Sequence, residues 1–191
     1  YLSDISIMKK KVDFVFKIVA IGDGRVGKTS LIKMFTESSF KKEYIKTIGA
    51  QFSSYHNEVD GKKIKLLFWD IAGQDEFHFL RPSFFKNSKA AIIICSLEDN
   101  KMGKESIEHI IHWYNDVTHY CGKIPIVLFA NKADLVNQYN LDELKFQKIV
   151  QDQDFLDYYI TSAKTGQGVK KAFKAIIEYL YYRNKELSPE F

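Results

Sequence analysis

Short apolar runs alternate along the chain with segments in which apolar residues recur at the spacing of a helix. The runs are rich in β-branched and aromatic residues, which is typical of buried strands, and they cover residues 14–21, 52–59, 64–70, 90–97, 124–130 and 158–160. Helical spacing or helix-start signals mark residues 30–35, 107–117, a segment that starts between Asn140 and Leu144, and 169–180. Asp60-Gly61 separates the second run from the third and predicts a hairpin turn.

Strands that alternate with helices in this way predict an α/β fold. Because most of the strands are apolar on both faces, helices should cover both sides of a mainly parallel sheet. The single hairpin adds one antiparallel strand at an edge. We therefore expect a six-stranded, mainly parallel sheet with one antiparallel edge strand, flanked by about five helices.

The composition fits one globular domain. Of 191 residues, 46% are hydrophobic and 27% are charged, so a sizeable core can form. The 28 Lys and Arg residues against 24 Asp and Glu give a net charge of +4, a milder basic excess than a nucleic-acid binder shows. The two cysteines, Cys95 and Cys121, predict no disulfide framework and a reducing, cytoplasmic environment.

The domain boundaries follow from where this pattern starts and stops. No apolar run reaches the roughly 20 residues that a membrane span needs, and the first dozen residues lack the apolar core of a signal peptide. We expect a monomeric domain over residues 14–184, a flexible N-terminal extension at 1–13 and a C-terminal tail at 185–191.

The first apolar run ends in a glycine-rich segment of defined spacing. Residues 22–29 read Gly-Asp-Gly-Arg-Val-Gly-Lys-Thr and match G-x-x-x-x-G-K-[ST]. Glycines let the backbone approach phosphate oxygens, and the helix that follows adds its positive N-terminal end. The plain alternative is a glycine turn before an ordinary helix, but the position between a buried strand and a helix favours a phosphate loop. The nucleotide-binding residues expected here are Gly22, Asp23, Gly24, Arg25, Val26, Gly27, Lys28, Thr29 and Ser30, with Lys28 on the β- and γ-phosphates and Thr29 on Mg²⁺.

A second set of polar residues predicts which base is bound. Asn131-Lys132-Ala133-Asp134 follows a buried strand, at the end of a parallel strand where ligands gather. A carboxylate only accepts hydrogen bonds, and guanine offers two neighbouring donors that adenine lacks, so Asp134 favours guanine. Three residues in a loop before the last helix complete the base site, where a backbone N–H meets the guanine O6 acceptor: Ser162, Ala163 and Lys164.

A third group follows the strand that ends at residue 70. Asp70 would hold the metal through water, and the Gly73 N–H would sense a γ-phosphate. Gln74 would orient the attacking water for in-line displacement and is the expected catalytic residue.

Taken together, these motifs resemble those of the Ras superfamily of small GTPases over residues 14–182. The segments 47–52 and 69–77 look most like the Rab family, in particular its endosomal members. Leu80-Arg81-Pro82 is similar to Rho proteins, but only 27 residues separate Asp134 from Ser162, too few for the extra helix of Rho. The resemblance implies the G domain of P-loop NTPases, with GTP or GDP and Mg²⁺ as cofactors.

The resemblance also implies roles for two switch segments. Thr47 would close on Mg²⁺ and the γ-phosphate, Phe40 would lie against the guanine, and residues 73–85 would form the second switch. The residues implied in effector binding are Tyr44, Ile48, Phe52, Trp69 and Phe84. Plain core packing is the alternative for the three aromatic residues Phe52, Trp69 and Phe84.

This sequence departs from the family pattern at several positions. Arg25 stands where Gly, Ala or Ser is usual, and we expect its side chain to point to solvent. Ile71 replaces a common Thr, and Phe84-Phe85 replaces a Tyr pair. No cysteine follows Cys121, so we expect membrane attachment only if a further C-terminal segment is lipidated.

The function expected from the resemblance is a Rab-like GTP/GDP switch in vesicle traffic, cytoplasmic or peripheral on endomembranes, with slow GTP hydrolysis. Its partners would be an exchange factor, a GTPase-activating protein and effectors, with no nucleic acid. The alternatives are an atypical GTPase-like scaffold, which Arg25 and Ile71 favour, and a nucleotide kinase or ATPase, which Asn131 and Asp134 oppose.

Three further groups do not point to separate chemistry. His109 and His112 share helical spacing but have no third ligand nearby, so we expect no metal site. Asp75-Glu76 is interpreted as switch-loop charge, and Cys95 as an inert buried thiol.

Overall fold

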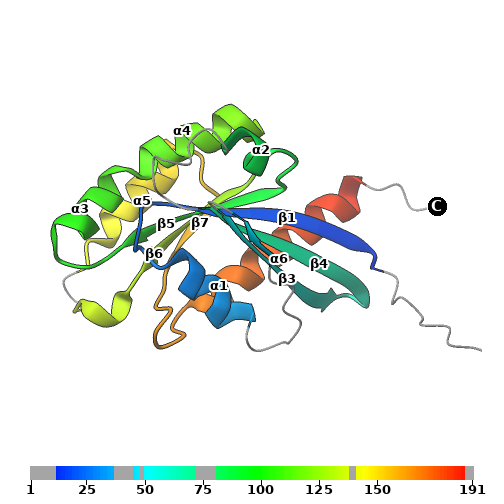
Figure 1. The fold of residues 1–191 in the computed structure, drawn as a ribbon, viewed down its shortest axis with the longest axis horizontal. Coiled ribbons are helices and arrows are strands. Elements are labelled where there is room, and N and C mark those ends of the chain that lie inside the picture. The colour runs from blue at the N-terminus through cyan, green and yellow to red at the C-terminus, as the bar shows by residue number, and fades with distance from the viewer. Residues whose placement is uncertain (1–11, 37–44, 48–49, 72–80, 138–140, 188–191) are drawn as a thin grey trace, which may run out of the picture.

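A computed structural model describes residues 12–36, 45–47, 50–71, 81–137 and 141–187. A seven-stranded sheet lies at its centre, in the order β2-β3-β4-β1-β5-β6-β7 (Figure 1). The strands are β1 (Phe14–Ile21), β2 (Ile45–Thr47), β3 (Ala50–Val59), β4 (Lys62–Ile71), β5 (Ala90–Ser96), β6 (Ile126–Asn131) and β7 (Asp157–Ile160).

The sheet is mainly parallel, as the sequence predicts. β1 pairs in parallel with β4 and β5, and β6 pairs in parallel with β5 and β7. β3 is the antiparallel strand, joined to β4 by a hairpin. A seventh strand, β2, adds to the six expected and pairs antiparallel to β3, so β3 is covered on its outer side. β2 has three residues, which is too short to leave a pattern in the sequence.

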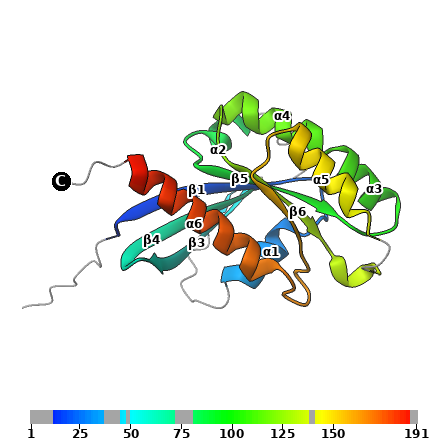
Figure 2. The same ribbon diagram turned by 180° about the vertical axis from the view of Figure 1, so that it is seen from behind.

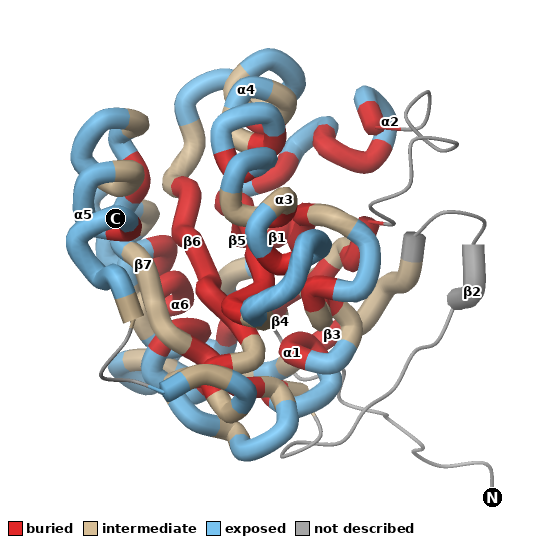
Figure 3. The backbone as a smooth tube through the Cα atoms, turned by 90° about the vertical axis from the view of Figure 1, so that its left-hand side faces the viewer, coloured by how far each residue is buried: buried red, intermediate tan, exposed pale blue. Residues whose placement is uncertain are grey.

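Helices cover both faces of the sheet (Figures 1 and 2). They are α1 (Lys28–Thr36), α2 (Arg81–Phe85), α3 (Lys101–Glu108), α4 (Ile110–Cys121), α5 (Glu143–Asp152) and α6 (Val169–Leu187). Alternate β1 side chains face opposite sides, so Ile18 packs with α1 and α6 while Val19 packs with α2, α4 and α5. Burial follows these layers, with the central strands buried and the outer helix faces exposed (Figure 3).

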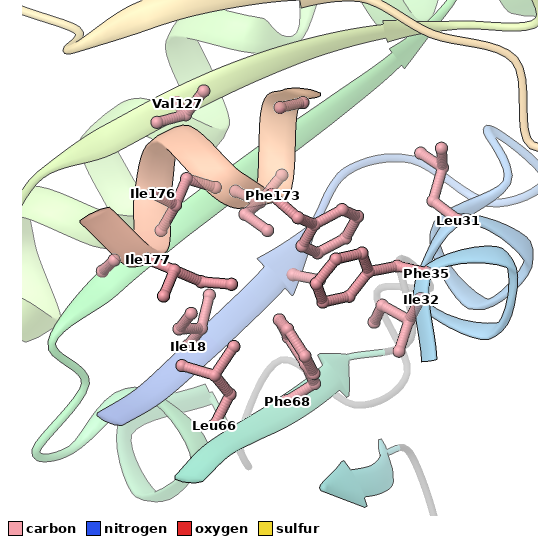
Figure 4. Packing of buried hydrophobic residues seen from close by; sticks show 14 of the residues in the cluster. Ile18, Leu31, Ile32, Phe35, Leu66, Phe68, Val127, Phe173, Ile176 and Ile177 are labelled. Carbon is pink, nitrogen blue, oxygen red and sulfur yellow. The ribbon is translucent and has the colours of Figure 1, made fainter. Parts of the chain in front are cut away.

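Aromatic rings fix the packing of α1 against α6. Phe35 stacks on Phe173 with ring centroids 4.2 Å apart and planes at 10°, and the edge of Phe68 meets Phe173 (Figure 4). All three are at most 5% exposed. Because α1 begins in the phosphate loop, this core holds one end of the candidate site in place.

Several helix boundaries differ from the predicted ones. α5 begins at Glu143, and its N-cap is Asp142, whose Oδ1 accepts from the Lys145 N–H at 3.2 Å, whereas Asn140 lies outside the described residues. The predicted helix at 107–117 is divided at His109 between α3 and α4. α6 continues to Leu187, past residue 180, where the predicted helical spacing ends. None of the described helices is both long and apolar enough to cross a membrane.

The parallel strands bring the candidate residues to one edge of the sheet. The phosphate loop follows the end of β1, Asp70 is the penultimate residue of β4, and Asn131 ends β6. The register pairs Ala20 with Asp70 and Ser96 with Asn131. The carboxyl edge of such a sheet is where ligands bind.

Candidate nucleotide-binding site

The backbone of the phosphate loop requires glycine at two positions. Gly22 has φ +141° and Gly27 has φ +99°. A Cβ on Gly22 would lie 2.1 Å from the Ile94 carbonyl oxygen, and one on Gly27 would lie 2.4 Å from Asn131 Nδ2. Gly24 has open space around it. Arg25 is exposed with φ +64°, which agrees with the expectation that its side chain faces solvent.

The Lys28 side chain folds back over the first residues of this loop. Its Nζ donates to the carbonyl oxygens of Gly22 at 2.9 Å and Asp23 at 2.8 Å. The side chain is buried, and burial lowers the pKa of the amine, although Asp70 and Asp23 oppose that shift. A bound phosphate is a stronger acceptor than a carbonyl oxygen because it is charged. The Lys28 amine can therefore exchange its hydrogen bonds to the carbonyl oxygens for hydrogen bonds to phosphate.

Thr29 and Asp70 form the candidate metal site. The Thr29 hydroxyl donates to Asp70 Oδ2. Asp70 is 8% exposed, and burial raises the pKa of its carboxyl, although Thr29 and Lys28 oppose that shift. Mg²⁺ prefers oxygen ligands, and a bound cation would favour the ionised form of this buried carboxylate. The oxygens present therefore fit Mg²⁺.

We expect Thr29→Asn to weaken GTP binding by about tenfold or more, because it removes the hydroxyl that would bind Mg²⁺ and that now bonds Asp70. The measurement is the release rate of fluorescent GTP with Mg²⁺ and with EDTA: chelation should accelerate release from the wild type and change little in the variant. Thr36→Asn, at the other end of α1, is the matched control. Unchanged GTP affinity in Thr29→Asn would contradict the metal assignment.

A pocket of about 430 Å³ opens beside the phosphate loop. This volume is in the usual range for small-molecule sites. Its lining residues are Gly27, Ser30, Glu98, Asn131, Lys132, Asp134, Leu135, Ala163 and Lys164. The phosphate loop, the segment 131–134 and the loop that holds Ala163 and Lys164 therefore meet around one pocket.

Asn131 connects the two loops of this pocket. Its Nδ2 donates to the Val26 carbonyl at 2.8 Å, and its Oδ1 accepts from the Ala163 N–H at 3.1 Å and the Thr161 hydroxyl at 3.4 Å. The residue is 1% exposed. Its amide therefore braces the phosphate loop against the loop after β7.

Asp134 presents the carboxylate that the guanine hypothesis requires. Its Oδ1 accepts from the Ser162 hydroxyl at 2.6 Å, and Lys164 Nζ lies 3.8 Å from its Oδ2. The Ser162 hydrogen bond is the main cause that lowers the pKa of this carboxyl below its ordinary value. Asp134 is thus ionised at neutral pH and accepts hydrogen bonds only.

Sequence analysis assigned no role at this site to three residues that the structure places in it. Glu98 lines the pocket and forms an ion pair with Lys132, which lowers the pKa of Glu98. His109 and Trp113 contact the Asp23 carboxylate of the phosphate loop. No motif marks these residues, since their partners lie far away along the chain.

The three aromatic residues implied in effector binding form one cluster. Phe52 and Trp69 are paired across β3 and β4, with ring centroids 4.4 Å apart, and Phe84 lies 5.9 Å from Trp69. Phe84 is buried at 8% exposure, whereas Phe52 and Trp69 are half-buried. Core packing therefore accounts for Phe84, and the effector role of this cluster stays a prediction.

Other predicted residues fall where the structure describes little. Thr47 ends β2, but its side chain is outside the description. The predicted residues that lie outside the described ranges are Phe40, Tyr44, Ile48, Gly73, Gln74, Asp75 and Glu76. Their roles remain predictions.

Three of the residues set aside by sequence analysis, His109, His112 and Cys95, lie in the described part of the chain. His109 Nδ1 lies 2.7 Å from Asp23 Oδ2 while His112 Nε2 lies 3.9 Å from Asp116, so the two histidines face different partners. Within the described ranges no three His, Cys, Asp or Glu side chains gather as metal ligands. Cys95 is fully buried, and burial raises the pKa of its thiol to about 12.

Comparison with known proteins gives a consistent result. The sequence profile of the Ras family matches residues 17–182. Ras-related protein Rab-15 of Rattus norvegicus is 31% identical over 182 residues, covering 94% of this chain and 84% of that protein. GTP-binding protein Rho1 of Kluyveromyces lactis is 36% identical over 174 residues, covering 83% and 80%. A GTP-binding RHO-like protein of Candida albicans is 31% identical over 186 residues, which is 97% of this chain but only 52%, about half, of that relative.

Proposed function

Because the chain belongs to the Ras family of small GTPases, which bind GTP or GDP with Mg²⁺ and hydrolyse GTP, we propose that it acts as a Rab-like switch in intracellular vesicle traffic. The observation that carries the nucleotide assignment is the pocket that Gly27 and Ser30 of the phosphate loop share with Asp134. The Thr29–Asp70 pair adds the oxygens that fit Mg²⁺. Bound GTP would hold both switch segments, and hydrolysis would release them.

The partners follow from the family in general: an exchange factor, a GTPase-activating protein and effectors. The Rab assignment is the finer part of the proposal. It is supported by the short connection between Asp134 and Ser162. In the described part of this connection α5 is the single α-helix, without the extra helix that the resemblance to Rho would imply. The similarity to Rho1 is as high as that to Rab-15, so a cellular experiment has to separate the two.

We expect Gln74→Leu to slow GTP hydrolysis stimulated by an activating protein by about 100-fold or more, because the attacking water loses its orienting group. Affinity for GTP should stay at the wild-type value, since Gln74 is not expected to hold the ground state. Single-turnover hydrolysis of bound GTP measures the rate, and titration with a fluorescent non-hydrolysable GTP analogue measures the affinity. Turnover at the original rate would show that another group orients the water, and a wild type that retains GTP without hydrolysing it would favour the scaffold alternative.

The location in the cell is tested with the same variants. We propose a cytoplasmic protein that is peripheral on endomembranes when GTP is bound. A fluorescently tagged full-length chain carrying Gln74→Leu should gather on endomembranes, whereas one carrying Thr29→Asn should stay dispersed. Recruitment of the first variant to the plasma membrane and actin-rich protrusions would favour a Rho-like role.

A further inference from the structure

The Asp23 carboxylate of the phosphate loop is held by two rings from the junction of α3 and α4. Trp113 Nε1 donates to its Oδ1 at 2.7 Å, and His109 Nδ1 lies 2.7 Å from its Oδ2. The backbone carbonyl of the same residue accepts from Lys28 Nζ at 2.8 Å. Asp23 is therefore fixed on one side by the amine that would contact phosphate and on the other by the helices.

The other surface of Trp113 contacts α2. The Arg81 guanidinium carbon lies 4.6 Å from the centroid of the Trp113 ring, within range of a cation–π interaction. Arg81 is 6% exposed, and its Nη1 donates to Asp116 Oδ2 at 2.6 Å. Asp116 stands three residues after Trp113 on α4, so the two present one surface to Arg81.

Trp113 thus touches two parts of the site at once. Arg81 is the first residue of α2 and stands seven positions after Gln74, the residue expected to orient water. The indole is 4% exposed, with its N–H on the phosphate loop and its ring face against α2, the helix at the end of the predicted second switch. A displacement of α2 would therefore move the Trp113 ring and change its hydrogen bond to Asp23.

We propose that Trp113 is a positioning residue that couples the phosphate loop to α2 and so sets how long nucleotide is retained. The carboxylate of Asp23 lies in a loop that has to accept phosphate charge, and its Oδ1 accepts the Trp113 N–H while its Oδ2 faces His109. The Trp113 hydrogen bond holds that carboxylate to the helices, and the Arg81 contact makes its strength depend on α2. This inference rests on the proposed nucleotide-binding function.

The first test is the dissociation rate of a fluorescent GDP analogue from Trp113→Phe. Phenylalanine keeps a ring for Arg81 but lacks the N–H, so Asp23 loses a hydrogen bond to a charged acceptor and release should be about tenfold faster. Preference for GDP over ADP should be unchanged, because Asp134 is untouched. The matched control is Tyr114→Phe, which removes one polar group from the next ring on α4 and should release the analogue at the wild-type rate.

The second test measures the fluorescence emission of Trp113 itself, so this residue is not substituted. The chain has two tryptophans, so Trp69→Phe leaves the emission of Trp113 alone. Replacement of bound GDP by a non-hydrolysable GTP analogue should shift that emission, and Arg81→Lys, which keeps the charge but loses the planar stack, should reduce the shift by at least about half.

The outcomes separate this inference from the proposed function. If the wild type does not bind the GDP analogue selectively, the proposed function is wrong. If the wild type binds the GDP analogue selectively, two results would contradict the coupling alone. One is release of the analogue from Trp113→Phe at the wild-type rate, and the other is a Trp113 emission that stays unchanged when GDP is replaced by the GTP analogue. Should Trp113→Phe fail to fold, the emission of the Trp69→Phe protein decides.

Discussion

Replacement of Gly22 by alanine is expected to prevent stable folding of the domain. The residue has φ +141°, a backbone conformation that side chains rarely adopt, and its new Cβ would lie 2.1 Å from the Ile94 carbonyl oxygen. Ile94 is paired with Phe129 inside the sheet, so its backbone has no room to move. We expect a loss of about 4 kcal/mol or more, a large share of the roughly 5–15 kcal/mol that stabilises a domain.

Urea unfolding followed by far-UV circular dichroism measures this loss, and the loop itself offers the control. At Gly24 no atom lies within 4 Å of the position that a Cβ would take, and φ is not positive, so Gly24→Ala should unfold within about 0.5 kcal/mol of the wild type. The pair separates the requirement for space at Gly22 from a general intolerance of side chains in the loop. Equal midpoints for the two variants would contradict the packing argument.

The elements that sequence analysis predicts well are those with local causes. The strand β1 is a run of apolar residues that ends at a glycine turn, and the loop after it is defined by spacing within eight residues. Asp134 follows from the chemistry of a carboxylate at the end of a buried strand. In each case the residues that decide the structure are neighbours in the chain, so the pattern is visible before folding.

The features that sequence analysis misses depend on contacts made only by the fold. Trp113 bonds a residue 90 positions away and Lys132 one 34 positions away, and neither a lone tryptophan nor a lone lysine indicates such a partner. The same holds for Asn131, whose amide braces two loops. At the start of α5, Asn140 and Asp142 are both good N-caps, so propensity alone does not choose between them.

Asp134→Asn is expected to lower the affinity for GTP by about 10³-fold, because the site is built around hydrogen bonds to the guanine edge. The carboxylate accepts from both guanine donors, whereas an amide places an N–H donor against the guanine 2-amino group. Xanthine carries an oxygen at that position, so the variant should bind xanthosine triphosphate better than the wild type does. The Ser162 hydroxyl can still donate to the remaining oxygen, which keeps the side chain in place.

Competition of GTP, xanthosine triphosphate and ATP against a fluorescent guanine nucleotide measures this change in preference. Asp154→Asn, which makes the same substitution at an exposed site paired with Lys123, is the control and should bind GTP like the wild type. Because Ser162 holds the pKa of Asp134 below its ordinary value, the wild-type preference should be unchanged between neutral pH and mildly acidic pH. A variant that still prefers GTP with undiminished affinity would mean that backbone groups, and not this carboxylate, distinguish guanine from the other purines.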